Sequence, residues 1–170
     1  MANFDKAITI ILAHEGGFVD NKFDQGGATN KGITFKLFKE YAVSLGLPKT
    51  VEALKTLTSD QAKFIYREQF WNKMRGDEIK DQQLANIVFD GFVNMGNRAI
   101  KMLQIEMGNP ADGIIGDRSL MVINQANPKI LFEDYKDARI KFYNDLVARK
   151  PDQKIFLKGW LNRINSFVYV

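Results

Sequence analysis

The chain contains no cysteine and a single histidine, His14, and both shortages restrict the chemistry open to it. Without cysteine it has no disulfide framework, no thiol nucleophile and no thiolate-bound zinc. One histidine argues against a histidine-rich metal site, and we expect neither a metal nor a cofactor. A Ser-His or Cys-His relay built around a second histidine is also excluded. Catalysis by this chain would therefore have to depend on carboxylates.

Long apolar runs are also missing, since no stretch approaches the roughly 18 to 20 apolar residues of a membrane span. The apolar run from Ala7 to Ala13 follows only Asp5 and Lys6, and no small-residue cleavage site comes after it. This pattern does not predict a secretory signal peptide. We expect a protein made in the cytoplasm that reaches the periplasm or the exterior by lysis or by a dedicated export route.

The composition is that of an ordinary globular protein, with 170 residues, 45% hydrophobic and 26% charged. The net charge of +4 is uneven: residues 1–126 are neutral, and residues 127–170 hold 9 Lys and Arg against 5 Asp and Glu. A basic last third suggests an anionic partner or surface, and a solvated helix face is the simpler alternative.

Helical periodicity dominates the chain, so we expect a mainly α, multi-helix fold with little sheet. The first helix carries apolar residues on one stripe and stops at the glycines 16–17, and residues 18–32 form a short hairpin or an ordered loop. Thr34 and Thr58 are suited to cap the next two helices. Further helices are expected at 82–95 and 97–107 with a break at Gly96, after Asp117 as a cap, from 128 to about 148, and around 156–167.

Glu15 is the first candidate for chemistry. It lies four residues after Ile11 and seven after Ile8, which places it on the buried stripe in the last turn of the first helix. Burial and the negative end of the helix both disfavour an ionised carboxylate there. A protonated carboxylic acid is what a glycosidase needs to protonate a leaving oxygen. A glutamate paired with a nearby Lys or Arg is the structural alternative.

The loop that follows supplies two possible partners, Asp20 and Asp24. The intervening glycines permit a chain reversal that would turn either carboxylate toward Glu15. Two carboxylates facing each other across a cleft are the usual equipment for glycoside hydrolysis.

The glycine-rich region around Glu15 belongs to a longer pattern. Its amino-terminal signature consists of Glu15, Gly16, Gly17, Phe18, Val19, Asp24, Gly26, Gly27, Thr29, Asn30, Gly32, Ile33 and Thr34. The later positions are Tyr66, Phe70, Trp71, Phe89, Asp90, Asn94, Gly96, Leu103, Gln104, Asp112, Gly113, Gly116, Gly159 and Trp160. The pattern resembles glycoside hydrolase family 108, the peptidoglycan N-acetylmuramidases of phages, prophages and bacterial lysis or export clusters (endolysins and secretion activators). The resemblance covers nearly the whole chain, and the amino-terminal signature is its most specific part.

The resemblance implies a lysozyme-like fold in which Glu15 is the catalytic acid for cleavage between N-acetylmuramic acid and N-acetylglucosamine. It also implies two parts, a catalytic part at 1–95 and a predicted peptidoglycan-binding part at 96–170, packed as one globular unit. The implied partner is the peptidoglycan glycan strand, bound by a monomer.

A looser likeness to phage-type lysozymes concerns the second carboxylate. Those enzymes place an acidic residue eight intervening positions after the glutamate, as Asp24 stands here, and a threonine five intervening positions later. Thr29 follows Asp24 after only four, so its role in holding a water is an open question. Asp20 is the alternative second carboxylate.

Several further residues are candidates for binding substrate. Tyr66 and Trp71 have aromatic faces suited to a sugar, although aromatics at helical spacing also build cores. Asn94 is able to bond an N-acetyl group or to cap the helix break at Gly96. Asn30, with Thr29, is able to bind substrate or to hold the loop together by side-chain bonds to the backbone.

Three functions of different classes remain open at this stage. The leading one is a muramidase, with a lytic transglycosylase acting at the same bond as its chemical variant. The second is a non-catalytic wall-binding or export-assisting module. The third, a nucleic-acid binder, depends only on the basic last third, and the chain has no recognition motif for it, so we expect no nucleic-acid partner.

Overall fold

The computed structural model describes residues 1–20 and 27–170, and its secondary structure is mainly helical, as expected from the periodicity. The chain divides into two compact units, Ile8–Gln69 and Met1–Ala7 with Phe70–Val170, here called the hairpin unit and the helical unit. Helix α1 (Phe4–His14) begins in the helical unit and continues into the hairpin unit.

The hairpin unit contains the sheet of the described residues, an antiparallel pair formed by β1 (Thr29–Asn30) and β2 (Ile33–Thr34). Three short helices follow it, α2 (Phe35–Tyr41), α3 (Val51–Lys55) and α4 (Ser59–Tyr66). A hairpin was expected after the first helix, and this expectation is confirmed.

Threonine caps begin all three of these helices. The Thr34 hydroxyl accepts a bond from the Leu37 amide, and the Thr50 hydroxyl accepts one from the Ala53 amide. Thr58 and Gln61 form a reciprocal capping box, in which each side chain accepts a bond from the other residue's amide. These bonds satisfy amides that the first turn of a helix leaves without a helical partner.

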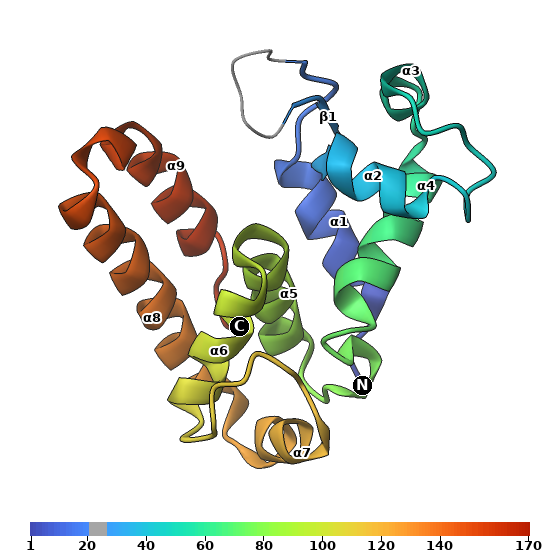
Figure 1. Cartoon of the computed structure of the whole chain (residues 1–170). Coiled ribbons are helices and arrows are strands. Elements are labelled where there is room, and N and C mark those ends of the chain that lie inside the picture. The colour runs from blue at the N-terminus through green and yellow to red at the C-terminus, as the bar shows by residue number, and fades with distance from the viewer. Residues whose placement is uncertain (21–26) are drawn as a thin grey trace. The chain divides into compact units, whose positions relative to one another are not determined.

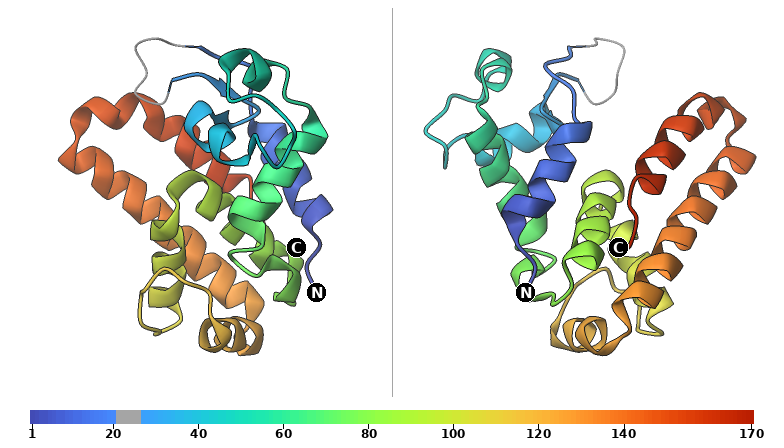
Figure 2. Two further views of the ribbon diagram at one scale, coloured as in Figure 1. Left: turned by 45° about the vertical axis from the view of Figure 1, so that its right-hand side comes forward. Right: turned by 180° about the vertical axis from the view of Figure 1, so that it is seen from behind.

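The helical unit holds the longer helices. A π-helical turn, η1 (Arg67–Trp71), leads into it from α4, and the 3₁₀ turn η2 (Gly76–Glu78) follows. The helices of this unit are α5 (Gln82–Met95), α6 (Asn97–Glu106), α7 (Asp117–Gln125), α8 (Pro128–Arg149) and α9 (Lys154–Asn165). Helices α8 and α9 lie side by side, joined by the 3₁₀ turn η3 (Pro151–Gln153), and form the helical hairpin visible in Figures 1 and 2.

Two glycines have distinct structural roles in this unit. Gly96, at φ 59°, forms the expected break between α5 and α6. Gly91 of α5 packs against the hydroxyl of Tyr135, and a β-carbon at position 91 would collide with it. Burial raises the pKa of the Tyr135 hydroxyl well above its ordinary value.

Some element boundaries differ from the expectation. Asp117 does not cap α7, because Gly116 is the residue before the helix and the Asp117 carboxylate instead bonds Arg75 at 2.5 Å. The helix after Thr34 ends at Tyr41, well before Gly46, and the chain continues to Gly46 as turns. The helix after Thr58 becomes the π-helical turn η1 from Arg67 onward.

One buried carboxylate connects three helices of the helical unit. Asp90 on α5 is fully buried, and its two oxygens bond Arg139 of α8 and Arg163 of α9, each at 2.7 Å. Arg139 is itself only 1% exposed, and it also donates to the carbonyl of Ile87. The pairing satisfies a carboxylate that would be very costly to bury alone.

None of the helices in residues 1–20 and 27–170 combines the length and apolar character needed to cross a bilayer.

The Asp90 cluster predicts a large stability difference between two equivalent substitutions. Asp90→Asn removes one charge from a buried cluster and should lower the free energy of unfolding by about 3–5 kcal/mol. Asp145→Asn breaks an exposed pair with Lys141, and should cost less than about 1 kcal/mol. Urea denaturation followed by circular dichroism measures both. Equal costs for the two variants would contradict a central role for Asp90.

Candidate active site

Glu15 directly follows the last residue of α1, His14. Its amide donates to the carbonyl of Leu12, three residues earlier, at 3.4 Å. An α-helical bond would reach four residues back, so the backbone leaves the α-helix at Glu15. Ile8 and Ile11 are buried as expected, but Glu15 is half-buried instead of lying fully on their buried stripe. The reason is that the helix ends one residue earlier, ahead of the two glycines.

A pocket of about 240 Å³ opens beside this helix end in the hairpin unit. Two glycines, Gly16 and Gly17, form part of its wall, so bare backbone lies beside Glu15 on that side. The residues that line it are Leu12, Glu15, Gly16, Gly17, Lys31 and Ser59.

The turn of the hairpin brings Glu15 and Tyr66 together. The Tyr66 hydroxyl donates a hydrogen bond of 3.0 Å to the carbonyl of Lys31. A β-carbon added to Gly32 would lie 2.5 Å from Oε2 of Glu15 and even closer to the Tyr66 hydroxyl oxygen. The Glu15 carboxyl and the Tyr66 hydroxyl therefore both pack against the backbone of the hairpin turn, in space that only glycine leaves open.

Local sequence explains why this turn forms. Lys31 and Gly32 occupy the two central positions with φ of 50° and 75°, the left-handed conformations that a tight two-residue hairpin requires. The buried Asn30 side chain donates to the carbonyls of Leu54 and Lys55 at 2.9 and 3.0 Å, which attaches the hairpin to the end of α3. Asn30 was expected either to bind substrate or to hold the loop by bonds to the backbone. The structure shows bonds of its side chain to backbone carbonyls.

Two of the other signature residues lie near the base of the loop. Thr29 and Val19 exchange two backbone hydrogen bonds of 2.8 Å, and Thr29 also pairs with Thr34 across the sheet. Asp20 is exposed and directly follows Val19. Asp24 lies outside the described residues, so the second carboxylate favoured by the sequence stays a prediction.

Trp71 and Asn94 belong to the helical unit and make contacts within it. The Trp71 ring is fully buried between the rings of Phe4 and Phe89, and its indole N–H donates to Asp77 at 2.8 Å. The exposed Asn94 side chain donates to the Asp90 carbonyl at 2.7 Å. These contacts are those of a core aromatic and of an intrahelical polar residue, and the Trp71 ring presents no face for a sugar.

The sequence reading missed two polar residues of the Glu15 pocket, Lys31 and Ser59. Lys31 stands between the signature residues Asn30 and Gly32. A two-residue hairpin turn here would have placed Lys31 at its tip in the left-handed conformation that the structure shows. Ser59 carries no local signal, since only the packing of α4 brings it to the pocket. Among residues 1–20 and 27–170, no group of three or more His, Cys, Asp or Glu residues is arranged to hold a metal ion.

Comparison with known proteins gives two family matches and several similar solved structures. Residues 8–96 match the family model Glycosyl hydrolase 108, and residues 98–165 match the Predicted Peptidoglycan domain. The structure of SagA from Brucella abortus is similar at a TM-score of 0.80, with 32% sequence identity over 96% of this chain and 90% of that chain. No curated protein matches the chain.

The family expected from the amino-terminal signature is thereby confirmed, and so is the lysozyme-like, peptidoglycan-directed character of the chain at this general level. The chain belongs to the glycosyl hydrolase 108 family, with a peptidoglycan-binding domain following the family's own region.

Proposed function

We propose that this protein is an N-acetylmuramidase that cleaves the bond between N-acetylmuramic acid and N-acetylglucosamine, with Glu15 as general acid. The observation that carries the proposal is the pocket of the hairpin unit, into which the family signature brings a half-buried carboxyl group. In its protonated form this group would donate its proton to the glycosidic oxygen as the bond breaks.

Positioning of the acid is the task of Gly32 and Tyr66. Both the carboxyl of Glu15 and the hydroxyl of Tyr66 lie against the hairpin turn, and the Tyr66 hydroxyl is bonded to it. A carboxyl group that is restrained on one side by backbone is held in one orientation, and general acid catalysis requires such an orientation. Tyr66 is therefore a positioning residue, which helps to hold Glu15 and does not itself react.

A second carboxylate would complete the reaction as base, nucleophile or electrostatic stabiliser. Asp24 is our first choice and Asp20 our second, with Thr29 as a residue able to hold a water. The distance between the two carboxyl groups decides the outcome, because about 5–5.5 Å suits a retaining enzyme and about 6.5–9.5 Å an inverting one. Attack by the substrate's own hydroxyl would instead make a lytic transglycosylase.

The two family matches support a division of labour along the chain. Residues 1–95 would carry the catalytic part and residues 96–170 the part that binds peptidoglycan, acting together in one monomer at the cell wall. The excess positive charge of residues 127–170 would draw this second part to an anionic wall.

Glu15→Gln tests the acid directly. The variant should keep its fold and lose about 10²–10⁴-fold in the rate of wall cleavage, since an amide has no proton of suitable acidity to donate. The measurement is mass spectrometry of fragments released from purified peptidoglycan. Wild type should release fragments with reducing N-acetylmuramic acid ends.

The matched control is Glu40→Gln, which makes the same change at an exposed glutamate of α2. Full activity of Glu15→Gln would overturn the assignment of the acid. Anhydro ends would change the reaction to that of a transglycosylase. A folded wild type that binds several wall types and releases nothing would identify a non-catalytic binding module.

Asp24→Asn and Asp20→Asn separate the two candidates for the second carboxylate. We expect Asp24→Asn to reduce the rate of wall cleavage at least about tenfold and Asp20→Asn to leave it within about twofold. Rates are followed by the appearance of reducing ends. The reverse pattern would assign the role to Asp20, and no effect of either would remove the second carboxylate from the mechanism.

Gly32→Ala tests the positioning of Glu15. A methyl group there collides with the Glu15 carboxyl and the Tyr66 hydroxyl, and a displaced acid should slow cleavage about 10- to 100-fold. Gly46→Ala is the control, because Gly46 has the same left-handed backbone with open space around its α-carbon. In both variants, alanine in a left-handed conformation should lower the free energy of unfolding by about 1–2 kcal/mol.

Both variants are assayed at a temperature where circular dichroism shows them folded. A rate loss of the same size in Gly46→Ala would show that reduced stability, and not displacement of the acid, explains the effect.

A further inference from the structure

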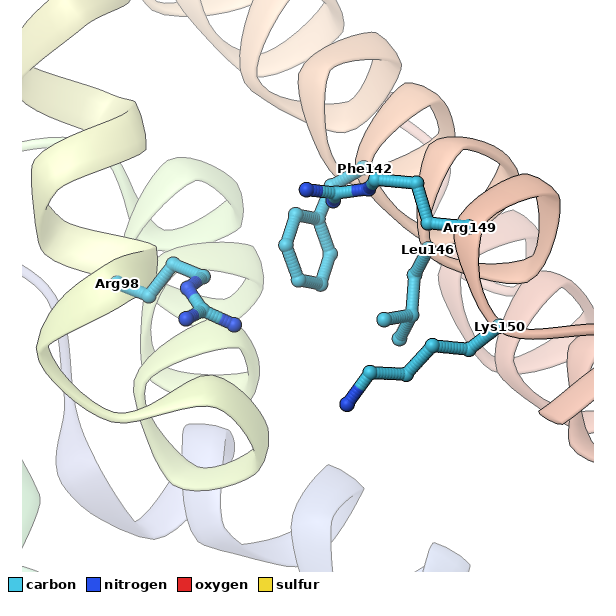
Figure 3. A pocket seen from close by; sticks show the side chains of 5 residues that line it. All are labelled: Arg98, Phe142, Leu146, Arg149 and Lys150. Carbon is cyan, nitrogen blue, oxygen red and sulfur yellow. The ribbon is translucent and has the colours of Figure 1, made fainter.

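A second pocket, of about 420 Å³, lies in the helical unit between α6 and the C-terminal end of α8. Figure 3 shows Arg98 reaching into it from α6, while Arg149 and Lys150 reach toward Arg98 from the opposite side. Phe142 and Leu146 of α8 form its apolar wall. All five lining residues fall within the region that matches the peptidoglycan domain.

The charge of this pocket is of one sign. Among residues 1–20 and 27–170, it is lined by three exposed cations and by no carboxylate. Across the part of the chain that the structure describes, none of the three forms an ion pair, whereas Lys141 on the same helix pairs with Asp145 at 2.6 Å. Three cations that converge without a protein counter-charge form a site of positive potential suited to an anion.

Two of these cations are held in place by their surroundings. The guanidinium of Arg98 lies over the Phe142 ring, 5.1 Å from its centroid. Arg149 donates from Nε to the carbonyl of Asp145 at 3.2 Å, which uses its inner nitrogen and leaves the two terminal nitrogens for another acceptor. A guanidinium restrained in this way loses less conformational entropy when it binds a planar oxyanion.

We propose that this pocket binds a free carboxylate of the peptidoglycan stem peptide, an inference that rests on the proposed action on peptidoglycan. Arginine forks match the geometry of a carboxylate, and Lys150 adds a third donor group. Phe142 and Leu146 provide an apolar surface for the alkyl part of the amino acid that carries the carboxylate. The volume is within the usual range of small-ligand pockets.

This apolar wall favours a peptide carboxylate over the phosphate of a wall polymer. A phosphodiester chain is hydrophilic along its length and gains nothing from contact with a phenyl ring and a leucine side chain. A stem peptide combines both features, since it presents aliphatic groups directly beside its carboxylates. The site would therefore recognise the peptide of the wall, while the proposed catalytic pocket acts on its sugar strand.

The test uses the full chain and two ligands that differ in one group. N-acetylmuramyl-L-alanine has one free carboxylate, on its alanine, and N-acetylmuramyl-L-alaninamide has an amide in its place. We expect isothermal titration calorimetry to show at least about tenfold tighter binding of the carboxylate form. Glycerol 3-phosphate, titrated separately, probes the phosphate source.

The variant is Arg98→Gln with Lys150→Gln, and the control is Arg118→Gln with Lys129→Gln. Arg118 and Lys129 are exposed cations of the same unit that do not line the pocket, so both double variants lose the same charge. Affinity for the carboxylate ligand should fall at least about tenfold in the first and stay within about twofold in the second. Thermal melts verify that both variants are folded.

Equal losses in the two double variants would overturn the site, because net charge and not the pocket would then set the affinity. Equal binding of the carboxylate and amide ligands would overturn the ligand assignment, and so would tighter binding of glycerol 3-phosphate. Neither ligand contains a glycosidic bond between two sugars. Failure of this pocket is therefore distinguishable from failure of the proposed muramidase, which is read from fragments of intact wall.

Discussion

The carboxylate of Asp90 is the interaction on which the helical unit depends. It is buried on α5 and bonded by arginines of α8 and α9, so one side chain joins α5 to two helices that come more than 30 residues later in the sequence. The charges would be unfavourable singly, and each is tolerated only because the others are present. These bonds link α8 and α9 to α5, and α8 also packs against α6, where the basic pocket forms.

A different constraint governs the hairpin unit, namely the absence of a side chain at Gly32. The turn needs left-handed backbone at this residue, and the Glu15 carboxyl and the Tyr66 hydroxyl occupy the space where a β-carbon would be. One glycine thus serves both the geometry of the turn and the close approach of two polar groups. Asn30, bonded to two carbonyls at the end of α3, keeps the turn in place from the other side.

The two pockets suggest how one short chain would act on a composite polymer. The pocket at Glu15 has a carboxyl group and glycine walls suited to glycan chemistry, and the pocket at Arg98 has the cations and apolar wall suited to peptide carboxylates. Each lies within its own compact unit. Binding of the stem peptide would raise the local concentration of glycan at the catalytic part. This follows from the two parts being on one chain, and it needs no contact between the pockets.

The sequence by itself determined the class of fold, the family and the place of Glu15 at a helix end, because helical periodicity, threonine caps and the glycine-rich signature are local patterns. It could not determine how Asp117 and Trp71 are used: Asp117 bonds Arg75, 42 residues away, and Trp71 lies among core rings. Nor could it indicate that Ser59 reaches the Glu15 pocket, or that Arg98 and Lys150 line one cavity. Only the tertiary structure decided these points, because they depend on which helix faces pack together, and helical periodicity shows which residues are buried without showing their neighbours.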